Sequence, residues 1–495
     1  MPISGMVSHD SIAGNRWGTG SRSWRERRWE RISDSSSLTR AGDQVIQGGQ
    51  RSRLLRLTFI LYITTLTTDA IRKVAELPTS TVGVVYIITA LIYIVIIPAT
   101  SGQRRTASRA TPRTLPLWLF MLSFWCLAVA LVQHTPPEMA LLGWVSYVFF
   151  VPLFYVGAEL AADDHLTARA FQAVVISGGI IGIGAVASAI LGQSAPAILQ
   201  PIVPAAGIHS FTTSENIYLS PSIFATSEEA SEQLLIALFA WAALPYLAYS
   251  RLRPKPWMFL GMLIISGLIV AARRADIDVA IAGIIMALVL GRVRAPAWSR
   301  RFIRRATAKA PGGLGTAAFL TIVGSTIFLI FLGQARLASF LVSGSPGSRI
   351  SYMFSLPNTG SLVGQGPGTS TQGVAVVGAA PLEGGELQGS LASYVLDGRT
   401  FITGEGGLTK TWIELGIIGV ALYTAIFCAV LTPVVKSLRR LDSAGVALTM
   451  LTIALGVVFL KGHQSLDDPL IQPLFWLGVG GIWGRMRAVA PIEQP

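Results

Sequence analysis

Four charged residues stand in a short connection between two apolar stretches. The connection, "AARRADID" (residues 271–278), follows "MFLGMLIISGLIV" and precedes "VAIAGIIMALVLG". Arg273 and Arg274 carry planar guanidinium groups, whose donors match the oxygens of a phosphate. Charge close to a bilayer is costly and usually functional, so we predict that these arginines bind an anion. The alternative is that they only neutralise Asp276 and Asp278 at a turn.

A second group of polar residues surrounds the start of another apolar stretch, in "TGEGGLTKTWIELGIIGVALY" (residues 403–423). Glu405 precedes that stretch and could accept a proton as a general base. Glu414 lies about one helical turn inside the stretch, and Lys410 is a supporting residue one turn earlier. A carboxylate within a membrane-spanning helix rarely lacks a partner. Glu414 therefore either serves the site or pairs with loop groups near the helix start, where negative charge is favoured.

Two further side chains are alternative bases, Glu229 in "TSEEAS" and His463 in "KGHQSLDDPL". Glu229 has a second interpretation, as a carboxylate that opens a helix beside Ser227 and Ser231. His463 also has a second interpretation, as a structural or solvated loop residue. The base is therefore left open among Glu405, Glu229 and His463.

The elements that carry these residues are predicted to be membrane-spanning helices. Of the 495 residues, 52% are hydrophobic and 13% are charged, whereas a soluble globular chain carries about 25% charged residues. Apolar runs of roughly 17–23 residues are long enough to cross a hydrocarbon core of about 30 Å as helices. We therefore expect an all-α polytopic membrane protein with about twelve transmembrane helices. The expected spans are residues 55–69, 79–98, 115–132, 139–160, 170–191, 232–249, 256–272, 277–291, 315–333, 411–432, 445–460 and 470–484.

The distribution of Lys and Arg predicts the orientation of these spans. The net charge is +13, and every second connection is basic, as in "SGQRRTASRATPR" and "KSLRRLDS". Short cytoplasmic loops hold such an excess, so both termini are predicted to be cytoplasmic and "AARRADID" to lie outside. The excess charge is thus explained without nucleic acid. Residues 1–54 read as a disordered basic cytoplasmic tail, 55–485 as the membrane domain and 486–495 as a second cytoplasmic tail.

Two outer connections, residues 192–231 and 334–410, are too long to be simple turns. The second is the large outer (periplasmic) loop between spans nine and ten, and it is rich in Gly, Ser and Thr. Structureless loops of this length are usually functional or disordered. We predict disorder for residues 369–398 and order for "SRISYMFSL", which contains Arg349 and apolar anchors. The string "GQGPG", with Gly366 and Gly368, is expected to form a tight backbone turn that approaches a ligand.

The order of these motifs resembles that of bacterial O-antigen ligases and of O-antigen or exopolysaccharide polymerases. The resemblance covers residues 55–485 and depends on several features: the spans, the outer loop between spans nine and ten, "ARRAD", "GSRISYMFSL", "GQGPG" and the "E-L-G-I-I-G" that opens span ten. The "TSEEAS" segment is similar to the Glu-Pro-Ser element of many polymerases, with Ala230 in place of the proline.

The resemblance implies a glycosyltransferase that moves a glycan from undecaprenyl diphosphate to an acceptor sugar hydroxyl. The reaction would occur at the outer face of the bacterial inner membrane, without a metal or another cofactor. Arginines of the family bind the diphosphate, and by position these are Arg273 or Arg274, and Arg349. Ligases of the family carry a histidine nine residues before the glutamate of span ten, where this sequence has Glu405. A polymerase is therefore favoured over a ligase.

The implied partners are a lipid-linked glycan donor, a lipid-linked or lipid A core acceptor, and membrane lipid, but not nucleic acid. Whether a separate chain-length regulator binds is left open. A rival from another class is a transporter of lipid-linked glycans, although the two halves of the chain show no repeat of the kind common in transporters. A peptidoglycan polymerase of the shape, elongation and division type is a third alternative, and the motif order fits it less well.

Overall fold

The computed structural model describes part of the chain, and residues 53–495 form one unit within it. The described residues are 53–68, 70–75, 83–102, 112, 114–161, 163–200, 220, 222–224, 227–247, 254–271, 362–370, 380–381, 393–396, 399–402, 407–437, 441–461 and 471–489. The predicted spans 277–291 and 315–333 lie outside these residues, as do nearly all of the predicted tail 1–54 and most of the two outer loops.

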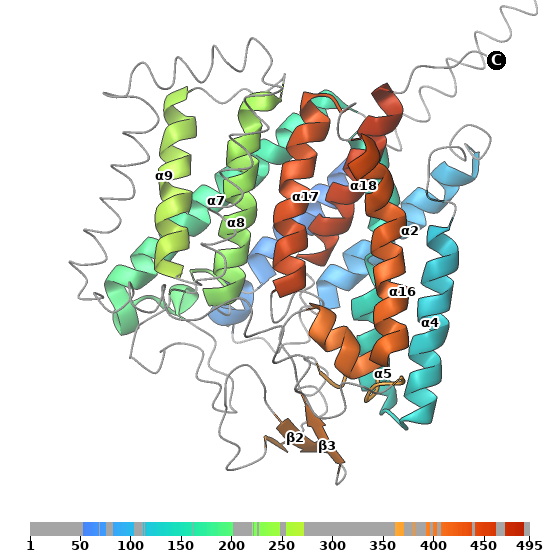
Figure 1. Cartoon of the computed structure of the whole chain (residues 1–495). Helices are drawn as coiled ribbons and strands as arrows, with labels where there is room; N and C mark the ends of the chain where they lie inside the picture. Colours follow the sequence, from blue (N-terminus) through green and yellow to red (C-terminus); the bar gives the residue numbers. More distant parts are fainter. Residues whose placement is uncertain are drawn as a thin grey trace, which may run out of the picture. The chain divides into compact units, whose positions relative to one another are not determined.

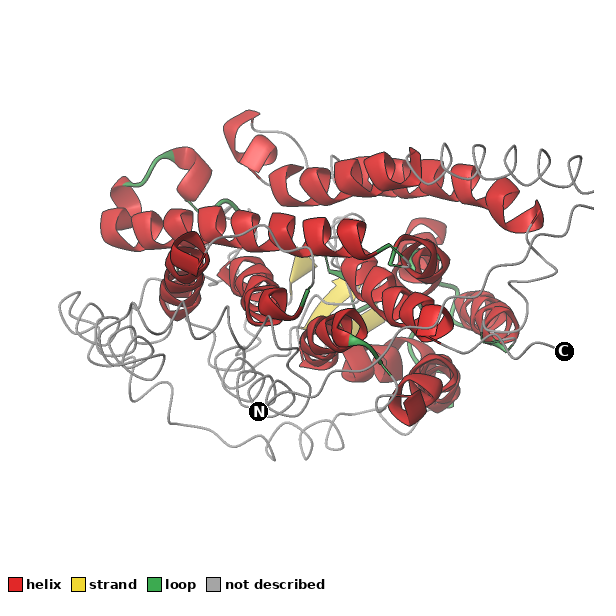
Figure 2. Ribbon diagram, turned by 90° about the horizontal axis from the view of Figure 1, so that it is seen from above, coloured by secondary structure: helices red, strands yellow, loops and turns green. Residues whose placement is uncertain are grey.

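Helices dominate the described part of the chain (Figures 1 and 2). A first helical segment covers residues 53–68 and 70–75. The longer helices that follow are α2 (Gly83–Gly102), α4 (Leu115–Val132), α5 (Pro137–Trp144), α6 (Leu153–Leu160), α7 (Asp164–Leu191), α8 (Ser227–Ala243), α9 (Pro254–Ala271), α16 (Gly407–Ser437), α17 (Ser443–Lys461) and α18 (Gln472–Val489). Every predicted span that falls within the described residues overlaps a helix.

Four of the helical stretches are long and apolar enough to cross a membrane, judged by length and composition. They are Leu115–Val132, Pro137–Leu160, Asp164–Leu191 and Gly407–Lys436, and shorter apolar helices cover Gly83–Val95, Pro256–Ala271 and Ala444–Ile453. Large apolar side chains point away from the protein on these helices, including Phe120, which is 67% exposed, and Phe124, which is 61% exposed. A lipid environment accounts for these exposed faces, because acyl chains are as apolar as the side chains.

Small residues allow several of the helices to pack closely. α6 packs against α18, and a Cβ on Gly157, Gly480 or Gly484 would collide with the backbone of the opposite helix. Such small-residue contacts are typical of helix pairs in membranes. α7 runs obliquely across α8 and α9 (Figure 1). Where α8 meets α9, Trp241 and Trp257 stack with ring centroids 4.6 Å apart, and each indole donates to the other residue's carbonyl.

One ionic cluster joins two connections and the end of α18 at a single end of the helix bundle. The Arg485 guanidinium, near the end of α18, forms ion pairs with Asp442 before α17 and with Asp164 at the start of α7. It also donates to the carbonyl of Ala161, which follows α6. The alternation of basic connections predicts that these segments lie on one side of the membrane, and the contacts place them at one end of the bundle.

A small antiparallel sheet interrupts the helical pattern and corrects part of the prediction. β1 (Ala380–Pro381) pairs with β2 (Ser393–Leu396), which pairs with β3 (Arg399–Ile402). The expected disorder of residues 369–398 is therefore wrong where β1 and β2 lie, whereas the regular structure of the described residues is otherwise helical, as the expected all-α class requires. The physical reason is local: "SYVL" and "RTFI" contain strand-forming residues, and the pair Asp-Gly between them favours a two-residue hairpin turn.

Candidate functional site

A break in α16 organises the candidate site. Gly416 has φ 68° and ψ −170°, so the helix axis is interrupted near the start of the predicted span. At the break, three successive carbonyls accept hydrogen bonds from outside the helix. Gln365 N–H donates to Ile413 at 2.7 Å and Gly366 N–H donates to Glu414 at 3.0 Å. The Trp125 indole donates to the third carbonyl, that of Leu415, at 2.9 Å. These bonds satisfy backbone groups that lipid could not satisfy.

The donors from residues 365 and 366 belong to a glycine turn, residues 362–370. Gly364, Gly366 and Gly368 have φ values of 74°, 119° and 81°, a region that favours glycine. The turn is also held by the connection between α4 and α5, where Gln133 Nε2 donates to the Gly364 carbonyl at 2.8 Å. A Cβ on Gly366 would collide with Thr135. The predicted tight turn is thus present, and what its glycines approach here is protein.

Glu414 binds the glycine turn through its carboxylate. The side chain is fully buried. Its Oε2 accepts from Gly368 N–H at 2.9 Å and from the Tyr147 hydroxyl at 3.0 Å, while Oε1 accepts from Ser370 N–H at 2.8 Å. Buried charge is tolerated when it is hydrogen-bonded in this way. Of the two interpretations of Glu414, the contacts match the one in which it pairs with loop groups near the helix start.

Lys410 and Tyr147 complete the buried cluster around Glu414. Lys410 is 1% exposed and lies one helical turn before Glu414, a spacing that places the two side chains on one helix face. Its ammonium nitrogen lies 5.5 Å from the centroid of the Tyr147 ring, within the range of a cation–π contact. Tyr147 belongs to a π-helical turn (Val145–Phe149) between α5 and α6. Such turns occur frequently at functional sites.

This arrangement is suited to positioning rather than to proton transfer by Glu414. Both carboxylate oxygens already accept hydrogen bonds, so the group fixes the turn against α16. The turn belongs to the predicted loop 334–410, and α16 begins at Gly407, in the last residues of that loop. The loop is therefore attached to the helix bundle at the glycine turn, through this cluster, and again where it continues into α16. Among the described residues, no group of three or more His, Cys, Asp or Glu side chains is arranged to hold a metal ion.

The predicted site residues divide into three groups. Glu414, Lys410, Gly366 and Gly368 are brought together. Glu229 lies elsewhere, half-buried in the first turn of α8, a helix that packs against α7, α9 and α17. Arg273, Arg274, Arg349, Glu405 and His463 lie outside the described residues.

Sequence reasoning missed Tyr147, Trp125 and Gln133. The two aromatic residues lie in apolar helical stretches where aromatic side chains are common, so no local pattern distinguishes them.

Comparisons with known proteins identify no family for this chain, so the resemblance described above depends on the motifs alone. No family model matches the chain, and no curated protein matches it significantly.

Proposed function

We propose that this chain is a membrane glycosyltransferase that uses an undecaprenyl-diphosphate-linked glycan as donor and extends a glycan chain, as an O-antigen or exopolysaccharide polymerase. The observation that carries the proposal is the glycine turn bound to broken α16 through Glu414. It anchors the one loop in which the motif order puts both a phosphate-binding arginine, Arg349, and a base, Glu405.

In the proposed reaction, cations stabilise the leaving diphosphate and a base accepts the proton of the acceptor hydroxyl. The bond between the donor sugar's anomeric carbon and the diphosphate oxygen breaks, and its electron pair leaves on the diphosphate. Arg273 or Arg274, together with Arg349, stabilise that charge, which is typically the largest contribution to such a transfer. The acceptor hydroxyl oxygen forms the new glycosidic bond and gives its proton to a carboxylate, Glu405 or Glu229. Glu414 acts as a positioning residue.

The ligase alternative differs only in the acceptor and in the base expected at position 405. A carboxylate can still accept a hydroxyl proton, but the histidine of the ligase pattern is replaced by Glu405. This departure favours the polymerase.

The transporter alternative gains one feature from the structure, because broken helices are common in transporters. In transporters the breaks lie near the bilayer midplane. Gly416 lies nine residues inside α16, which begins at Gly407, or about 13.5 Å along a helix. Half the hydrocarbon thickness is about 15 Å, so the position of the break does not separate a transporter from an enzyme, and the enzyme is favoured because the two halves of the chain show no repeat.

The decisive experiment reconstitutes the purified protein in lipid nanodiscs with lipid-linked repeat units extracted from a strain of the source bacterium that lacks the gene. A polymerase converts them into a ladder of longer lipid-linked glycans, read by gel and mass spectrometry. Transfer to added lipid A core alone would identify a ligase. Absence of any new glycosidic bond, with net movement of the lipid-linked glycan across proteoliposomes, would overturn the enzyme assignment.

A further inference from the structure

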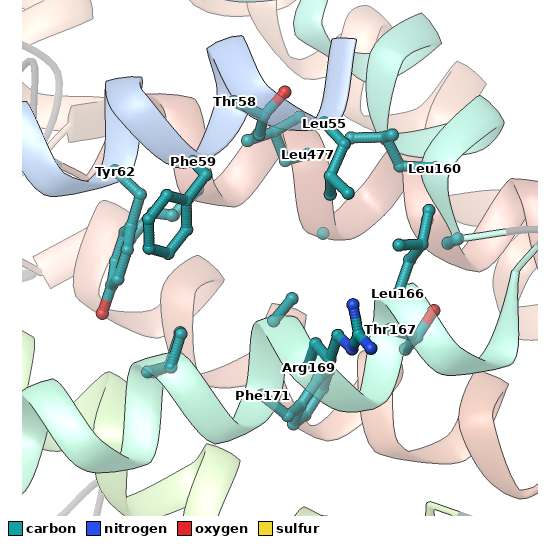
Figure 3. A pocket seen from close by; sticks show the side chains of 18 of the residues that line it. Leu55, Thr58, Phe59, Tyr62, Leu160, Leu166, Thr167, Arg169, Phe171 and Leu477 are labelled. Atoms are coloured by element: carbon teal, nitrogen blue, oxygen red, sulfur yellow. The ribbon is translucent and has the colours of Figure 1, made fainter. Parts of the chain in front are cut away.

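An apolar groove lies between the first helical segment and the helices α6, α7, α17 and α18. Its volume is about 420 Å³, within the range of small-molecule sites. Figure 3 shows its walls, with Leu55 and Phe59 on one side and Leu166 and Phe171 on the other. Phe59 is 52% exposed, so the groove is open toward the surroundings of the bundle. For a helix bundle in a bilayer, those surroundings are lipid.

Two arginines are the charged residues that line this groove. Figure 3 shows the Arg169 guanidinium directed into the space between the helices, and Arg56 lines the groove from the first helical segment. Within the described part of the chain, neither has a hydrogen bond or ion pair with an acidic side chain. The hydroxyls of Thr58 and Thr167 instead donate to carbonyls of their own helices. The arginines are therefore the groups available to bind an anion.

The arginines lie at the end of the bundle that carries the ionic cluster of Arg485. Arg169 follows Asp164 by five residues on α7, or about 7.5 Å. The glycine turn binds the first part of α16, whereas Asp442 of the ionic cluster follows the last part of that helix. The groove's charged end and the candidate functional site therefore lie toward opposite ends of the bundle.

The length of the groove matches one leaflet of a bilayer. On the first helical segment its lining runs from Leu55 to Thr65, a separation of ten residues or about 15 Å. Half of a hydrocarbon core is about 15 Å thick. Near its far end, the Tyr62 hydroxyl is hydrogen-bonded to Ser177 Oγ at 2.5 Å, a contact that joins the first segment to α7. Beyond the charged end, the groove therefore offers an apolar path about as long as an acyl chain.

We propose that this groove binds an anionic glycerophospholipid from the leaflet on the side of the Arg485 cluster. Its acyl chains lie along the apolar walls, and its phosphate binds Arg56 and Arg169. Guanidinium groups bind phosphate through paired, charge-assisted hydrogen bonds. The bound lipid would fill the space between the first helical segment and α7. The site is separate from the proposed glycan donor site, which belongs to the opposite end of the bundle.

The test measures lipid binding to the delipidated full-length protein in detergent by native mass spectrometry, with phosphatidylglycerol and phosphatidylcholine of matched acyl chains. We expect phosphatidylglycerol to bind about tenfold more tightly, because its net negative charge is attracted by the two guanidinium groups, whereas the choline cation of phosphatidylcholine offsets the charge of its phosphate. The double variant Arg56→Gln/Arg169→Gln should lose this preference. The matched control is Arg53→Gln, an exposed arginine of the same segment that does not line the groove.

A second pair of variants tests the groove by its shape. Ala170→Trp places an indole in the lining and should reduce binding of both lipids, whereas Ile176→Trp, at a 45% exposed position of α7 outside the lining, should not. Equal binding of the two lipids to the wild type, or equal losses in the controls, would overturn the proposal. Displacement of phosphatidylglycerol by inorganic phosphate, or binding of undecaprenyl phosphate alone, would also overturn it, in favour of a free-anion or a carrier-lipid site.

Discussion

Replacing Glu414 with Gln should release the glycine turn from α16. The carboxylate accepts from two backbone amides and one hydroxyl. An amide retains one acceptor oxygen and turns an NH₂ group toward at least one of these donors. A buried donor left without an acceptor costs about 1–3 kcal/mol. The remaining hydrogen bonds also become weaker, because their acceptor no longer carries a charge. We therefore expect the docked state of the turn to be weakened by about 3 kcal/mol.

Hydrogen–deuterium exchange of the turn measures this loss directly. A change of about 3 kcal/mol in local opening speeds amide exchange roughly 100-fold. Peptides that cover residues 362–370 should show it in Glu414→Gln, while peptides from α6, which packs against α18, should not. Glu138→Gln is the matched control, because Glu138 is exposed in the first turn of α5. Unchanged exchange of the turn in Glu414→Gln would refute the argument that this carboxylate holds it.

The double variant Lys410→Met/Glu414→Gln asks whether the two buried charges act as a pair. Removal of one partner leaves the other charge buried without compensation, whereas removal of both is often much less costly. We expect the double variant to lose less thermal stability than the sum of the single variants. Strict additivity would show that Lys410 is stabilised by other groups.

The remaining predictions concern the backbone break and the proposed chemistry. Gly416→Ala should lower the melting temperature and activity, because φ 68° with ψ −170° is a region essentially confined to glycine and costs another residue about 1–3 kcal/mol, and because a Cβ there would collide with the Leu362 backbone. Gly83→Ala, where a Cβ meets nothing within 4 Å, is the control. Arg349→Lys should reduce polymer formation nearly as much as Arg349→Ala, because lysine lacks the planar fork; near-normal polymer would reduce Arg349 to bulk charge. Glu405→Gln should lower the transfer rate by about 100- to 10,000-fold with donor binding retained. If Glu405→Gln instead makes normal polymer and Glu229→Gln makes none, the base is Glu229.

Within the described residues, the sequence alone was sufficient to locate the apolar helices, a tight turn and a buried carboxylate that needs partners. A run of apolar residues long enough to cross a bilayer must be helical, because lipid offers its backbone no hydrogen bonds. The three glycines of residues 364–368 predicted a tight turn, and the position of Glu414 inside an apolar run predicted that it needs partners. The Asp-Gly pair between β2 and β3 also predicts a hairpin, so disorder was the wrong expectation for β2.

The tertiary structure alone decided which groups those partners are. Tyr147 lies 267 residues before Glu414, and Trp125 lies 290 residues before the carbonyl that it binds. No periodicity could pair them, because lipid tails are as apolar as Leu and an apolar helix face does not specify its neighbour. The pairing follows from close approach at small residues and from the need of each buried polar group for a partner. Both depend on the three-dimensional arrangement of helices far apart in the chain.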